Sequence, residues 1–446
     1  MRSELQWFEK PLGALTCNHD GKRKPVKESE RKKGPYPYYG ASGIVDYVDG
    51  YLFEGRHLLI AEDGENLRTR QTPIAFIADG KFWVNNHAHI VTGNGEVTTE
   101  YLHYFLQNAD IHSYLTGAVM PKLTQGNLNR IPVRYPEPGY QKLIVRVLGG
   151  LDSKINLNRR INQTLEAMAQ AIFRSWFVDF EPVKAKIAAL AERRDPLRAA
   201  MGAISGKAEA ELNVLPPEQY EQLAATAALF PDEMEELGLR EIPKGWGDGV
   251  LGDICNFTAG SAFKPEHQGS TEGDYPFIKV SDMNLDGNEV FIQSANNYVS
   301  KAQQSEMRAK LHPSGATVFA KIGVALTSNR RRLLTTPTII DNNLMSACPI
   351  EGKVGKYFLY SLLSTIDFNT LVSGTALPYL NVSDLKKISV VRPLDDIIQA
   401  FESRTFSIFS MMQTLAMQCS TLVTTRDALL PKLLSGEIEL SVPAER

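Results

Sequence analysis

The segment 101–136 recurs as residues 358–393, at a constant offset of 257 and without a gap. Ten of its 36 positions are identical in the two copies, where average residue usage would give about two. Asn85-Asn86 and Asn342-Asn343 keep the same offset, so the duplication extends back through most of each half. A long period repeated once predicts two copies of one domain rather than a solenoid of many short units. The identical pairs are Leu102/Leu359, Leu106/Leu363, Asp110/Asp367, Gly117/Gly374, Pro121/Pro378, Leu123/Leu380, Leu128/Leu385, Ile131/Ile388, Val133/Val390 and Pro136/Pro393.

Each copy is followed by a stretch that predicts a long helix. From Gln141 to Phe177 there is no proline, and apolar residues recur at steps of three and four. A similar pattern follows Pro393, and we expect that second helix to end at Pro431. The apolar stripes are narrow, as in coiled coils, and a long helix cannot bury such a stripe alone. We therefore expect the two helices to pack against each other, antiparallel.

The remaining sequence predicts an α+β fold. Short β-type runs between glycine, proline and tyrosine residues indicate two mixed, strand-rich domains, joined by the two long antiparallel, coiled-coil-like helices as a pseudo-two-fold internal repeat. A charged, alanine-rich stretch between the copies predicts a helical insertion with a linker. The expected boundaries are 1–140 for the first strand-rich domain, 141–181 for the first helix region, 182–245 for the insertion and linker, 246–395 for the second strand-rich domain, and 396–446 for the second helix region and C-terminal tail.

Composition restricts the location and the binding partners. The chain has no run of 18 apolar residues and begins without an apolar signal-type stretch, so we expect a cytoplasmic protein that does not contact a membrane. Its four cysteines form no Cys-x-x-Cys pair, which favours reduced thiols over a zinc site or disulfides. Because the net charge is −3, any contact with nucleic acid must use local basic patches or a basic partner.

Several strings, in this order and duplicated, resemble the specificity subunit of type I restriction-modification systems over essentially the whole chain. They are GPYPYYGASGIVDYVDGYLFEGRHLLIAEDG (34–64), MPKLTQGNLNRIPV, NLNRRINQTLEAMAQAIFRSWFVDFEPV, YPFIKVSDMN (275–284), GATVFAKIG (315–323) and LPYLNVSDLKKISV. The resemblance implies that each strand-rich domain is a target-recognition domain for one half of a bipartite sequence in double-stranded DNA. The long stretch 184–240 departs from the simplest family pattern, and its role is open.

The resemblance also implies the partners. The helices would form a spacer that docks two methyltransferase (modification) subunits, and endonuclease/translocase (restriction) subunits would join that core. Catalysis, namely adenine-N6 methylation and ATP-dependent DNA cleavage, would belong to these partners, together with S-adenosylmethionine, ATP and Mg²⁺, and this chain would carry no cofactor. The sequence agrees, because it contains neither an amino-methyltransferase [Asn/Asp]-Pro-Pro-[Tyr/Phe] tetrapeptide nor a phosphate-binding glycine motif. The alternatives are a helical adaptor without DNA specificity and a stand-alone metal-dependent nuclease.

In the first domain, a run of lysine and arginine is followed by tyrosines, which predicts a clamp on DNA phosphates. The alternative is a solvated surface loop. Further candidates lie near the end of the domain, where the two copies differ and a reader of a different half-site should differ. The DNA-binding candidates are Lys22, Arg23, Lys24, Lys27, Arg31, Lys32, Lys33, Tyr36, Tyr38, Tyr39, Arg68, Arg70, Lys122, Gln125, Asn127 and Asn129.

In the second domain, three consecutive arginines beside asparagine are the sharpest candidates, since arginine can donate two hydrogen bonds to guanine. Because three arginines in a row are unfavourable to bury, the alternative is a solvated turn. At the paired positions Thr124 and Asn381, a helix cap is the structural alternative. The candidates here are Lys279, Ser281, Lys321, Ser328, Asn329, Arg330, Arg331, Arg332, Tyr379, Asn381 and Lys386.

Other side chains suggest a partner surface and, less strongly, a metal site. A polar belt and an aromatic cluster on the first helix are candidate contacts for partner subunits, although the aromatics are slightly better explained by packing against a recognition domain. The partner candidates are Asn158, Arg159, Arg160, Gln163, Phe173, Trp176 and Phe177. His87 and His89 could begin a metal site, but with no third ligand we expect a packed or surface pair and no metal. Glu62-Asp63 and the Asn85-Asn86 pair are best explained as turns.

Overall fold

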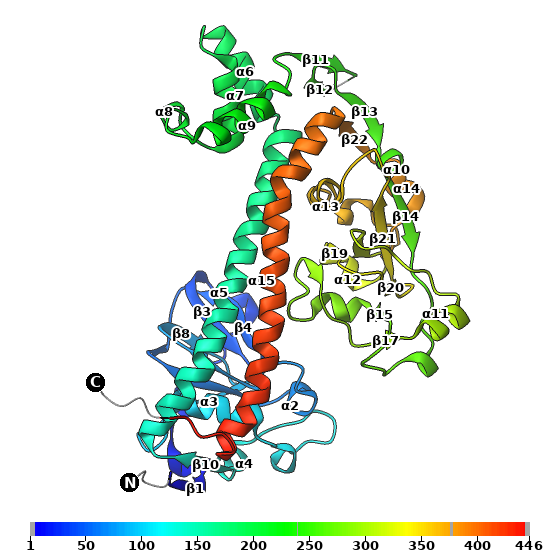
Figure 1. Cartoon of the computed structure of the whole chain (residues 1–446). Coiled ribbons are helices and arrows are strands. Elements are labelled where there is room, and N and C mark those ends of the chain that lie inside the picture. The colour runs from blue at the N-terminus through cyan, green and yellow to red at the C-terminus, as the bar shows by residue number, and fades with distance from the viewer. Residues whose placement is uncertain (1–4, 239, 375–377, 442–446) are drawn as a thin grey trace. The chain divides into compact units, whose positions relative to one another are not determined.

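The computed structural model describes residues 5–238, 240–374 and 378–441. The chain divides into two compact units, one with the residues up to 155 and from 421 onward, and one with residues 156–420. Each unit contains a strand-rich domain and part of two long helices, α5 (Pro138–Phe177) and α15 (Asp395–Ser435), as Figure 1 shows. Residues 375–377 of the second repeat copy lie outside the described residues.

The first strand-rich domain contains two four-stranded sheets, of order β2-β9-β6-β7 and β4-β3-β8-β5, and a pairing of β1 with β10. The short β-type runs of this domain include residues 43–48, 58–61 and 74–77, and they form β4, β6 and β7 within a residue or so, which confirms them as strands. The elements are β1 (Trp7–Pro11), α1 (Leu12–Leu15), β2 (Thr16–Asn18), η1 (Asp20–Lys22), η2 (Glu28–Glu30), β3 (Lys33–Gly40), β4 (Gly43–Val48), β5 (Phe53–Glu54), β6 (His57–Ala61), α2 (Asn66–Thr69), β7 (Ala75–Ala78), β8 (Lys81–Val84), β9 (Ala88–Gly93), α3 (Thr99–Asn108), η3 (His112–Tyr114), α4 (Gln125–Asn129) and β10 (Pro132–Pro136).

The second strand-rich domain repeats this topology. Its order β14-β21-β18-β19 corresponds to β2-β9-β6-β7 and is extended by β16, its order β17-β15-β20 corresponds to β4-β3-β8, and β13 pairs with β22. The strand directions also agree, since β3–β8 and β15–β20 are both parallel. The elements are β13 (Gly247–Val250), α10 (Leu251–Ile254), β14 (Cys255–Ala259), η4 (Pro265–His267), β15 (Tyr275–Ile278), η5 (Val280–Asn284), β16 (Phe291–Ile292), β17 (Tyr298–Val299), α11 (Lys301–Met307), β18 (Thr317–Ala320), α12 (Val324–Thr327), β19 (Arg332–Leu334), β20 (Ile339–Ile340), β21 (Leu344–Pro349), α13 (Lys356–Thr365), η6 (Phe368–Leu371), α14 (Val382–Lys386) and β22 (Ser389–Arg392).

The residues shared by the two copies form the scaffold of each domain. Leu102 and Leu359, like Leu128 and Leu385, are fully buried at equivalent places. Gly117 and Gly374 have φ angles of +88° and +84°, a conformation that favours glycine. A Cβ atom on Gly117 would also lie 2.1 Å from the carbonyl oxygen of Met120. The internal sequence identity is therefore explained by packing and backbone geometry.

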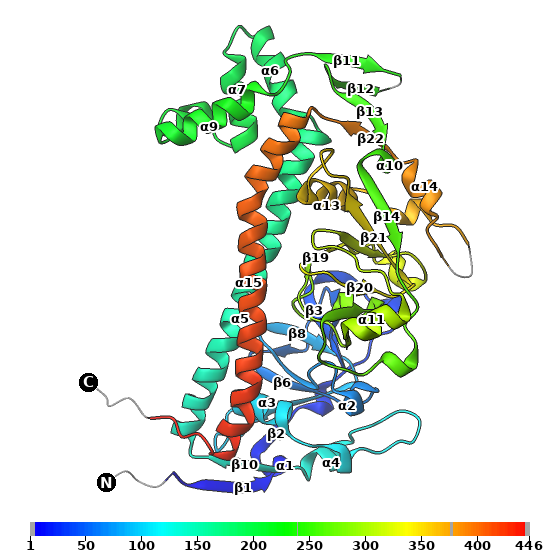
Figure 2. The ribbon, with the colours of Figure 1, turned by 45° about the vertical axis from the view of Figure 1, so that its right-hand side comes forward.

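The two long helices are antiparallel and lie side by side (Figure 2). In one unit Asn158 donates to Gln418 at 3.2 Å and Asn162 donates to the Met412 carbonyl at 3.1 Å. In the other unit, Arg426 of α15 forms an ion pair with Asp152 of α5 at 2.9 Å. Along these contacts the residue numbers of α5 rise while those of α15 fall, as expected for antiparallel helices. Both predicted helices are confirmed.

The predicted end of the second helix at Pro431 is wrong. α15 continues to Ser435 with Pro431 inside it. Proline removes one backbone donor and would normally break a helix interior. Here the last turn is held because Leu430, Leu433 and Leu434 are buried in the core of the first domain.

An aromatic cluster and a helical module complete the second unit. Phe173, Trp176 and Phe177 of α5 pack with Phe358 and Phe401 in one core. The predicted helical insertion is confirmed, and its helices α6 (Glu181–Ala191), α7 (Pro196–Ser205), α8 (Glu209–Leu212) and α9 (Pro217–Ala228) join the same core. The expected linker after them instead contains a hairpin of β11 (Met234–Leu237) and β12 (Arg240–Pro243).

Among the described helices, none combines the length and the apolar character that crossing a lipid bilayer requires.

Candidate nucleic-acid interface

Several turns of the first domain meet at one edge, where β3, β6 and β8 end. The Glu62 amide donates to the His87 carbonyl at 2.9 Å, and the Asn85 amide donates to the Tyr39 carbonyl at 3.0 Å. The loop before α4 joins the same edge, because the Leu123 amide donates to the Glu62 carbonyl at 2.8 Å. Backbone hydrogen bonds therefore fix the turns at 62–64 and 85–87 and the loop at 121–124 relative to one another.

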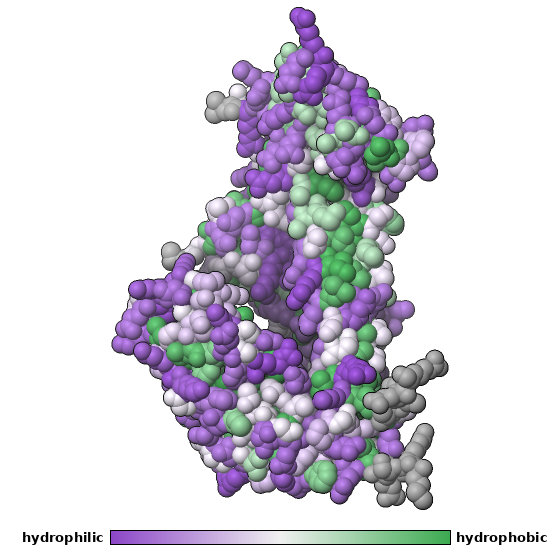
Figure 3. Space-filling model, turned by 90° about the vertical axis from the view of Figure 1, so that its left-hand side faces the viewer, coloured by the Kyte–Doolittle hydropathy of each residue, from purple (hydrophilic) through white to green (hydrophobic). Residues whose placement is uncertain are grey.

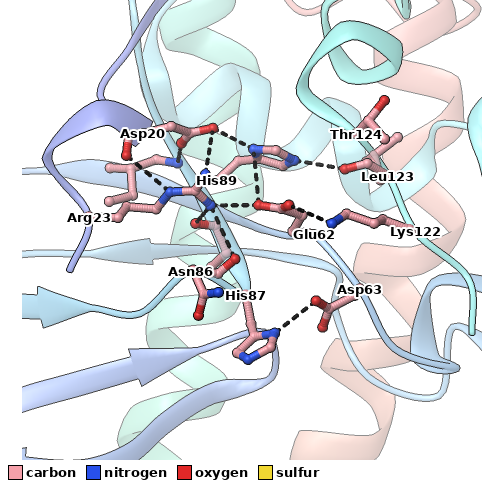
Figure 4. Close-up of polar contacts among 12 residues, drawn as sticks. Asp20, Arg23, Glu62, Asp63, Asn86, His87, His89, Lys122, Leu123 and Thr124 are labelled. Atoms are coloured by element: carbon pink, nitrogen blue, oxygen red, sulfur yellow. Dashed lines mark hydrogen bonds and ion pairs between the residues drawn. The ribbon is translucent and has the colours of Figure 1, made fainter. Parts of the chain in front are cut away.

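A buried polar network holds this edge together (Figure 4). The His89 ring is 1% exposed; its Nδ1 lies 2.6 Å from the Asp20 carboxylate and its Nε2 lies 2.7 Å from the Leu123 carbonyl. Both nitrogens of the buried ring therefore have a polar partner. His89 therefore joins the start of the basic segment to the loop before α4.

Arg23 and Lys122 balance the carboxylates of this network. Arg23 forms an ion pair with Glu62 at 2.6 Å, and Lys122 reaches the other oxygen of Glu62 at 3.2 Å. Burial of the Asp20 carboxyl works to raise its pKa, but hydrogen bonds from His89 and the Ile90 amide and the charge of Arg23 outweigh burial and lower the pKa. For Glu62, burial is likewise outweighed, mainly by Arg23 and His89, and the pKa is lowered. Both groups are therefore held as anions.

The basic segment of residues 22–33 runs from this edge along the sheet that contains β3. Lys22, Lys24, Lys27, Lys32 and Lys33 are exposed. Among the described residues, none lies within ion-pairing distance of these five ammonium groups. The lysines therefore remain predicted phosphate contacts.

Four other candidates of the first domain serve its own structure. Arg23 holds the network described above, and Arg31 forms an ion pair with Asp46 at 3.2 Å. Arg70 donates to the carbonyls of Leu106 and Ala109. Tyr38 is buried, and its hydroxyl accepts a hydrogen bond from the Val26 amide at 2.9 Å. The DNA contact of buried Tyr38 is corrected to a structural role, while half-buried Arg23, Arg31 and Arg70 have partners inside the domain and their DNA contact stays a prediction.

The remaining tyrosines and Arg68 lie nearer the surface. Tyr36 packs on Tyr51 with ring centroids 5.1 Å apart, and Tyr39 packs partly on Phe82. Arg68 donates to the Gly117 carbonyl at 2.8 Å and so braces the loop that leads to Lys122. For these three residues a DNA contact remains a prediction.

The short helix α4 shows which of the paired positions are structural. Thr124 accepts a hydrogen bond from the Asn127 amide, which confirms it as the cap of α4, whereas Asn381 makes no side-chain cap bond to α14. Asn127 donates to the Tyr114 carbonyl at 2.8 Å and is also structural. Gln125 is exposed and Asn129 is half-buried, so both remain predicted readers.

The arginine triplet of the second domain is not an exposed row. Arg331 is 4% exposed, its guanidinium lies 3.7 Å from the centre of the Phe368 ring, and it donates to the Ile366 carbonyl at 2.6 Å. Burial lowers the pKa of Arg331 to about 10 and also lowers the pKa of Arg332. Arg332 is half-buried and donates to the Met283 carbonyl at 3.3 Å. The prediction that all three arginines contact DNA is corrected, and only Arg330 is exposed.

The other DNA-binding candidates of the second domain also fall into two groups, those with partners inside the domain and those that remain accessible. Asn329 accepts hydrogen bonds from Arg331 and the Phe368 amide, and Lys279 donates to Gln268, so both have structural partners. A cleft of about 280 Å³ lies beside Arg330, between the segments 280–284 and 320–330. Ser328 lines it. Ser281, Tyr379, Asn381 and Lys386 are exposed and Lys321 is half-buried, so these five remain predictions.

Most of the proposed partner-binding cluster lies inside the protein. Phe173, Trp176 and Phe177 are 1%, 1% and 7% exposed, and Asn158 is fully buried against α15. Their predicted contact with a partner is corrected, because they form the core between the helices and the second domain. Arg159 forms an ion pair with Asp286 at 3.1 Å, while Arg160 and Gln163 are exposed and remain candidates.

His87 and His89 are a surface and a packed histidine, and Glu62-Asp63 lies in a turn. His89 is buried, and exposed His87 contacts Asp63 at 2.8 Å. In the described part of the chain, no three His, Cys, Asp or Glu side chains are grouped to hold a metal ion. Sequence reasoning missed the exposed apolar residues Ile44, Val45 and Tyr47 on β4, although the nearly unbroken apolar run beside the Gly40–Gly43 turn was a signal.

The network predicts that Asp20→Asn destabilises the first domain. The substitution removes a buried carboxylate that contacts the Arg23 guanidinium, the His89 ring and the Ile90 amide, so we expect the free energy of unfolding to fall by about 3 kcal/mol. Urea denaturation at neutral pH measures this effect. Asp110→Asn is the matched control, because Asp110 also contacts a histidine, His112, but both side chains are exposed. An equal effect of the two substitutions would contradict the role of the network.

The effect of Asp20→Asn should also depend on pH. A carboxyl with a lowered folded pKa stabilises the fold above its ordinary pKa of 3.8, and this stabilisation is lost as the pH falls through the lower folded value. The difference between wild type and Asp20→Asn should therefore be full at about pH 5 and narrow below about pH 4. Denaturation at pH 5, 4 and 3 tests this, and a difference that widens on acidification would refute it.

Substitution of the two neighbouring arginines should lower the stability of the protein by different amounts. Arg331→Ala removes a buried hydrogen-bonded cation, and we expect a loss of about 2 kcal/mol or more. Arg330→Ala removes an exposed side chain and should change stability by less than about 0.5 kcal/mol. Thermal denaturation of both variants measures these losses. A larger loss of stability in Arg330→Ala than in Arg331→Ala would contradict this assignment.

Comparison with known proteins agrees with the two-copy architecture. The family model described as "Type I restriction modification DNA specificity domain" matches twice, at residues 6–167 and 243–410. The HindI specificity subunit of Haemophilus influenzae is 32% identical over 417 residues, covering 89% of this chain and 86% of that protein. The MjaIX specificity subunit of Methanocaldococcus jannaschii is 26% identical over 453 residues, covering 97% and 94%.

A solved structure has the same fold. The S subunit of a type I restriction-modification system from M. genitalium aligns with 99% of this chain and 98% of its own length, at 13% identity and a TM-score of 0.54. The family match covers most of the chain and falls on both copies of the repeat. Together these findings show that the chain belongs to the family of type I restriction-modification specificity subunits, which recognise DNA sequence.

Proposed function

We propose that the chain is the non-catalytic reader of a type I restriction-modification complex, and that each strand-rich domain reads one half of a bipartite target in double-stranded DNA. One observation carries this proposal: two domains share one topology, yet their exposed side chains differ at equivalent places. Exposed Lys122 of the first copy stands where the second has exposed Tyr379, and exposed Gln125 stands where the second has half-buried Val382. A common scaffold with different edges is what two readers of different sequences require.

The chemistry of reading would combine two kinds of contact. Lysines such as those of the basic segment displace counterions from phosphates and give affinity that falls steeply with salt. Side chains at the edge of each domain would contact base edges in the major groove, where all four base pairs differ. The phosphate contacts position the protein, and the base contacts select the sequence.

The helix pair would dock the partner subunits. Apolar side chains gather along the helix pair next to the α6–α9 module (Figure 3). On α5, Leu157 and Met168 are 51% and 48% exposed, and half-buried Ile161, Leu165 and Ile172 lie at helical spacing between and beyond them. An apolar stripe that is partly exposed along a helix favours an interface with another protein. Two methyltransferase subunits are the proposed occupants, in keeping with the twofold repeat.

The same proposal assigns the chemistry and the location. Methyl transfer with S-adenosylmethionine, and DNA cleavage with ATP and Mg²⁺, would belong to the methyltransferase and endonuclease/translocase subunits. The complex would work in the cytoplasm, where it meets DNA.

Exchanging residues 1–140 for those of a relative with another specificity tests the modular readers. We expect the assembled complex to methylate a new sequence in one half of its target while the other half and the length of the unread spacer stay the same. Sequencing of methylated sites measures the result. A change in both halves would contradict two independent readers.

Charges placed on the apolar stripe should prevent assembly. Leu157→Glu with Met168→Glu places two carboxylates on the proposed contact, and we expect binding to the methyltransferase subunits to weaken at least tenfold, as measured by analytical ultracentrifugation. Ala167→Glu is the matched control, since one residue along the helix turns the side chain by about 100°. Assembly of the double variant at wild-type affinity would exclude the stripe as the docking surface.

A further inference from the structure

The two recognition domains differ at the connection that follows β3 in the first and β15 in the second. In the first domain β3 and β4 form a hairpin, with Ala41 and Ser42 between Gly40 and Gly43. In the second domain the equivalent strands β15 and β17 are joined by residues 279–297, which contain η5 and β16. Since the strands on either side of it correspond, this connection gives the two domains different surfaces.

The hairpin exposes large apolar side chains on an edge strand. β4 is the edge of the sheet β4-β3-β8-β5, and Ile44, Val45 and Tyr47 on it are 47%, 53% and 52% exposed. An exposed edge strand with apolar side chains favours association with another molecule. In the part of the chain that the structure describes, no strand pairs with the outer edge of β4.

The tip of the hairpin lies at the edge held by the His89 network. The Asn85 amide donates to the Tyr39 carbonyl at 3.0 Å, and a Cβ atom on Gly40 would lie 3.2 Å from the Asn85 side-chain nitrogen. The turn that follows Asn85 is in turn bonded to Glu62. The hairpin therefore projects from the same edge that carries Lys122 and Gln125.

The hairpin is narrow at its tip and supported along its length. Ala41 and Ser42 are small, and Gly43 has a φ angle of +116° that a larger residue rarely adopts. Arg31 braces the ribbon, because its guanidinium contacts Asp46 of β4 and lies 4.6 Å from the centre of the Tyr38 ring of β3. A braced ribbon loses little entropy when it binds.

Charge indicates which kind of molecule fits beside this ribbon. The basic segment that ends in β3 carries the five exposed lysines described above, while Asp46 of β4 is already paired with Arg31. An apolar ribbon flanked by unpaired lysines is complementary to a polyanion with apolar groups between its charges. In the major groove of DNA, the thymine C5-methyl group is such an apolar feature between two rows of phosphates.

We propose that the β3–β4 hairpin is the reading element of the first domain, that it enters the major groove, and that Ile44 and Val45 contact thymine methyl groups there. The groove is about 12 Å wide and accepts a two-stranded β-ribbon. The lysines of the basic segment contact the flanking phosphates. This inference rests on the proposed function, namely that the first domain reads one half-site.

The test uses the complex assembled with its methyltransferase subunits and a duplex carrying its own target. Each thymine of the first half-site is replaced in turn by deoxyuridine, which lacks only the C5-methyl group. We expect at least one replacement to weaken binding about fourfold, the value of one buried methyl group. The same replacements in the second half-site serve as the control.

Ile44→Ser with Val45→Ser should remove this sensitivity. The double variant is expected to bind the thymine duplex about as weakly as wild type binds the deoxyuridine duplex, with no further loss on deoxyuridine. The matched variant Ile44→Val with Val45→Ile keeps the apolar contact and should keep the sensitivity. Circular dichroism confirms that each variant is folded.

The outcomes separate this inference from the function on which it rests. If no thymine of the first half-site responds to deoxyuridine, or if the assembled serine variant keeps the deoxyuridine sensitivity of wild type, the hairpin is not the reader. If the native complex selects no two-part sequence at all, the proposed function itself fails.

Discussion

The whole chain depends on the mutual burial of two long apolar stripes. α5 and α15 have 40 and 41 residues, which corresponds to about 60 Å of helix at 1.5 Å per residue, and neither could keep its stripe from water alone. Their stripes meet each other, and in each unit the same helices also supply part of the core of the strand-rich domain. Folding of each domain and pairing of the helices are therefore energetically linked, because the same side chains contribute to both.

Polar groups inside this arrangement serve specificity more than stability. Asn158 is buried in the helix pair and hydrogen-bonds to Gln418, a contact that fixes the register of one helix against the other. The His89 network acts in the same way inside the first domain, because Asp20 and Leu123 must both be in place for the two ring nitrogens to have polar partners. A buried ion network contributes little net stability, but it strongly disfavours other arrangements of the same edge.

The sequence predicted those features that depend on local pattern. The absence of proline and the steps of three and four located both helices, and the internal repeat identified the residues of the shared scaffold. The cap at Thr124 followed from residue type alone, while Asn381 shows that the same position can be filled without a cap bond. Helix continuation past Pro431 depended on the burial of Leu433 and Leu434, which local pattern does not reveal.

The errors in the candidate site arose from contacts distant in sequence. Arg331 was expected on the surface, but the Phe368 ring and the Ile366 carbonyl make its burial favourable, and neither is near it in the chain. Arg70 and Arg23 were likewise assigned by charge, without knowledge of the carbonyls and carboxylates that surround them, although their DNA contact stays a prediction. Exposed side chains such as Ile44 and Val45 were overlooked because an apolar run in a strand usually indicates a core.

Two independent readers of DNA within one chain are the central feature of the proposed function. Mapping of methylated adenines in the native genome, with the chain present and with its coding sequence deleted, tests this most directly. We expect a motif of two short blocks separated by a constant number of unread base pairs, present with the chain and lost without it. A single contiguous motif, or a two-block motif that persists after deletion, would contradict two independent readers.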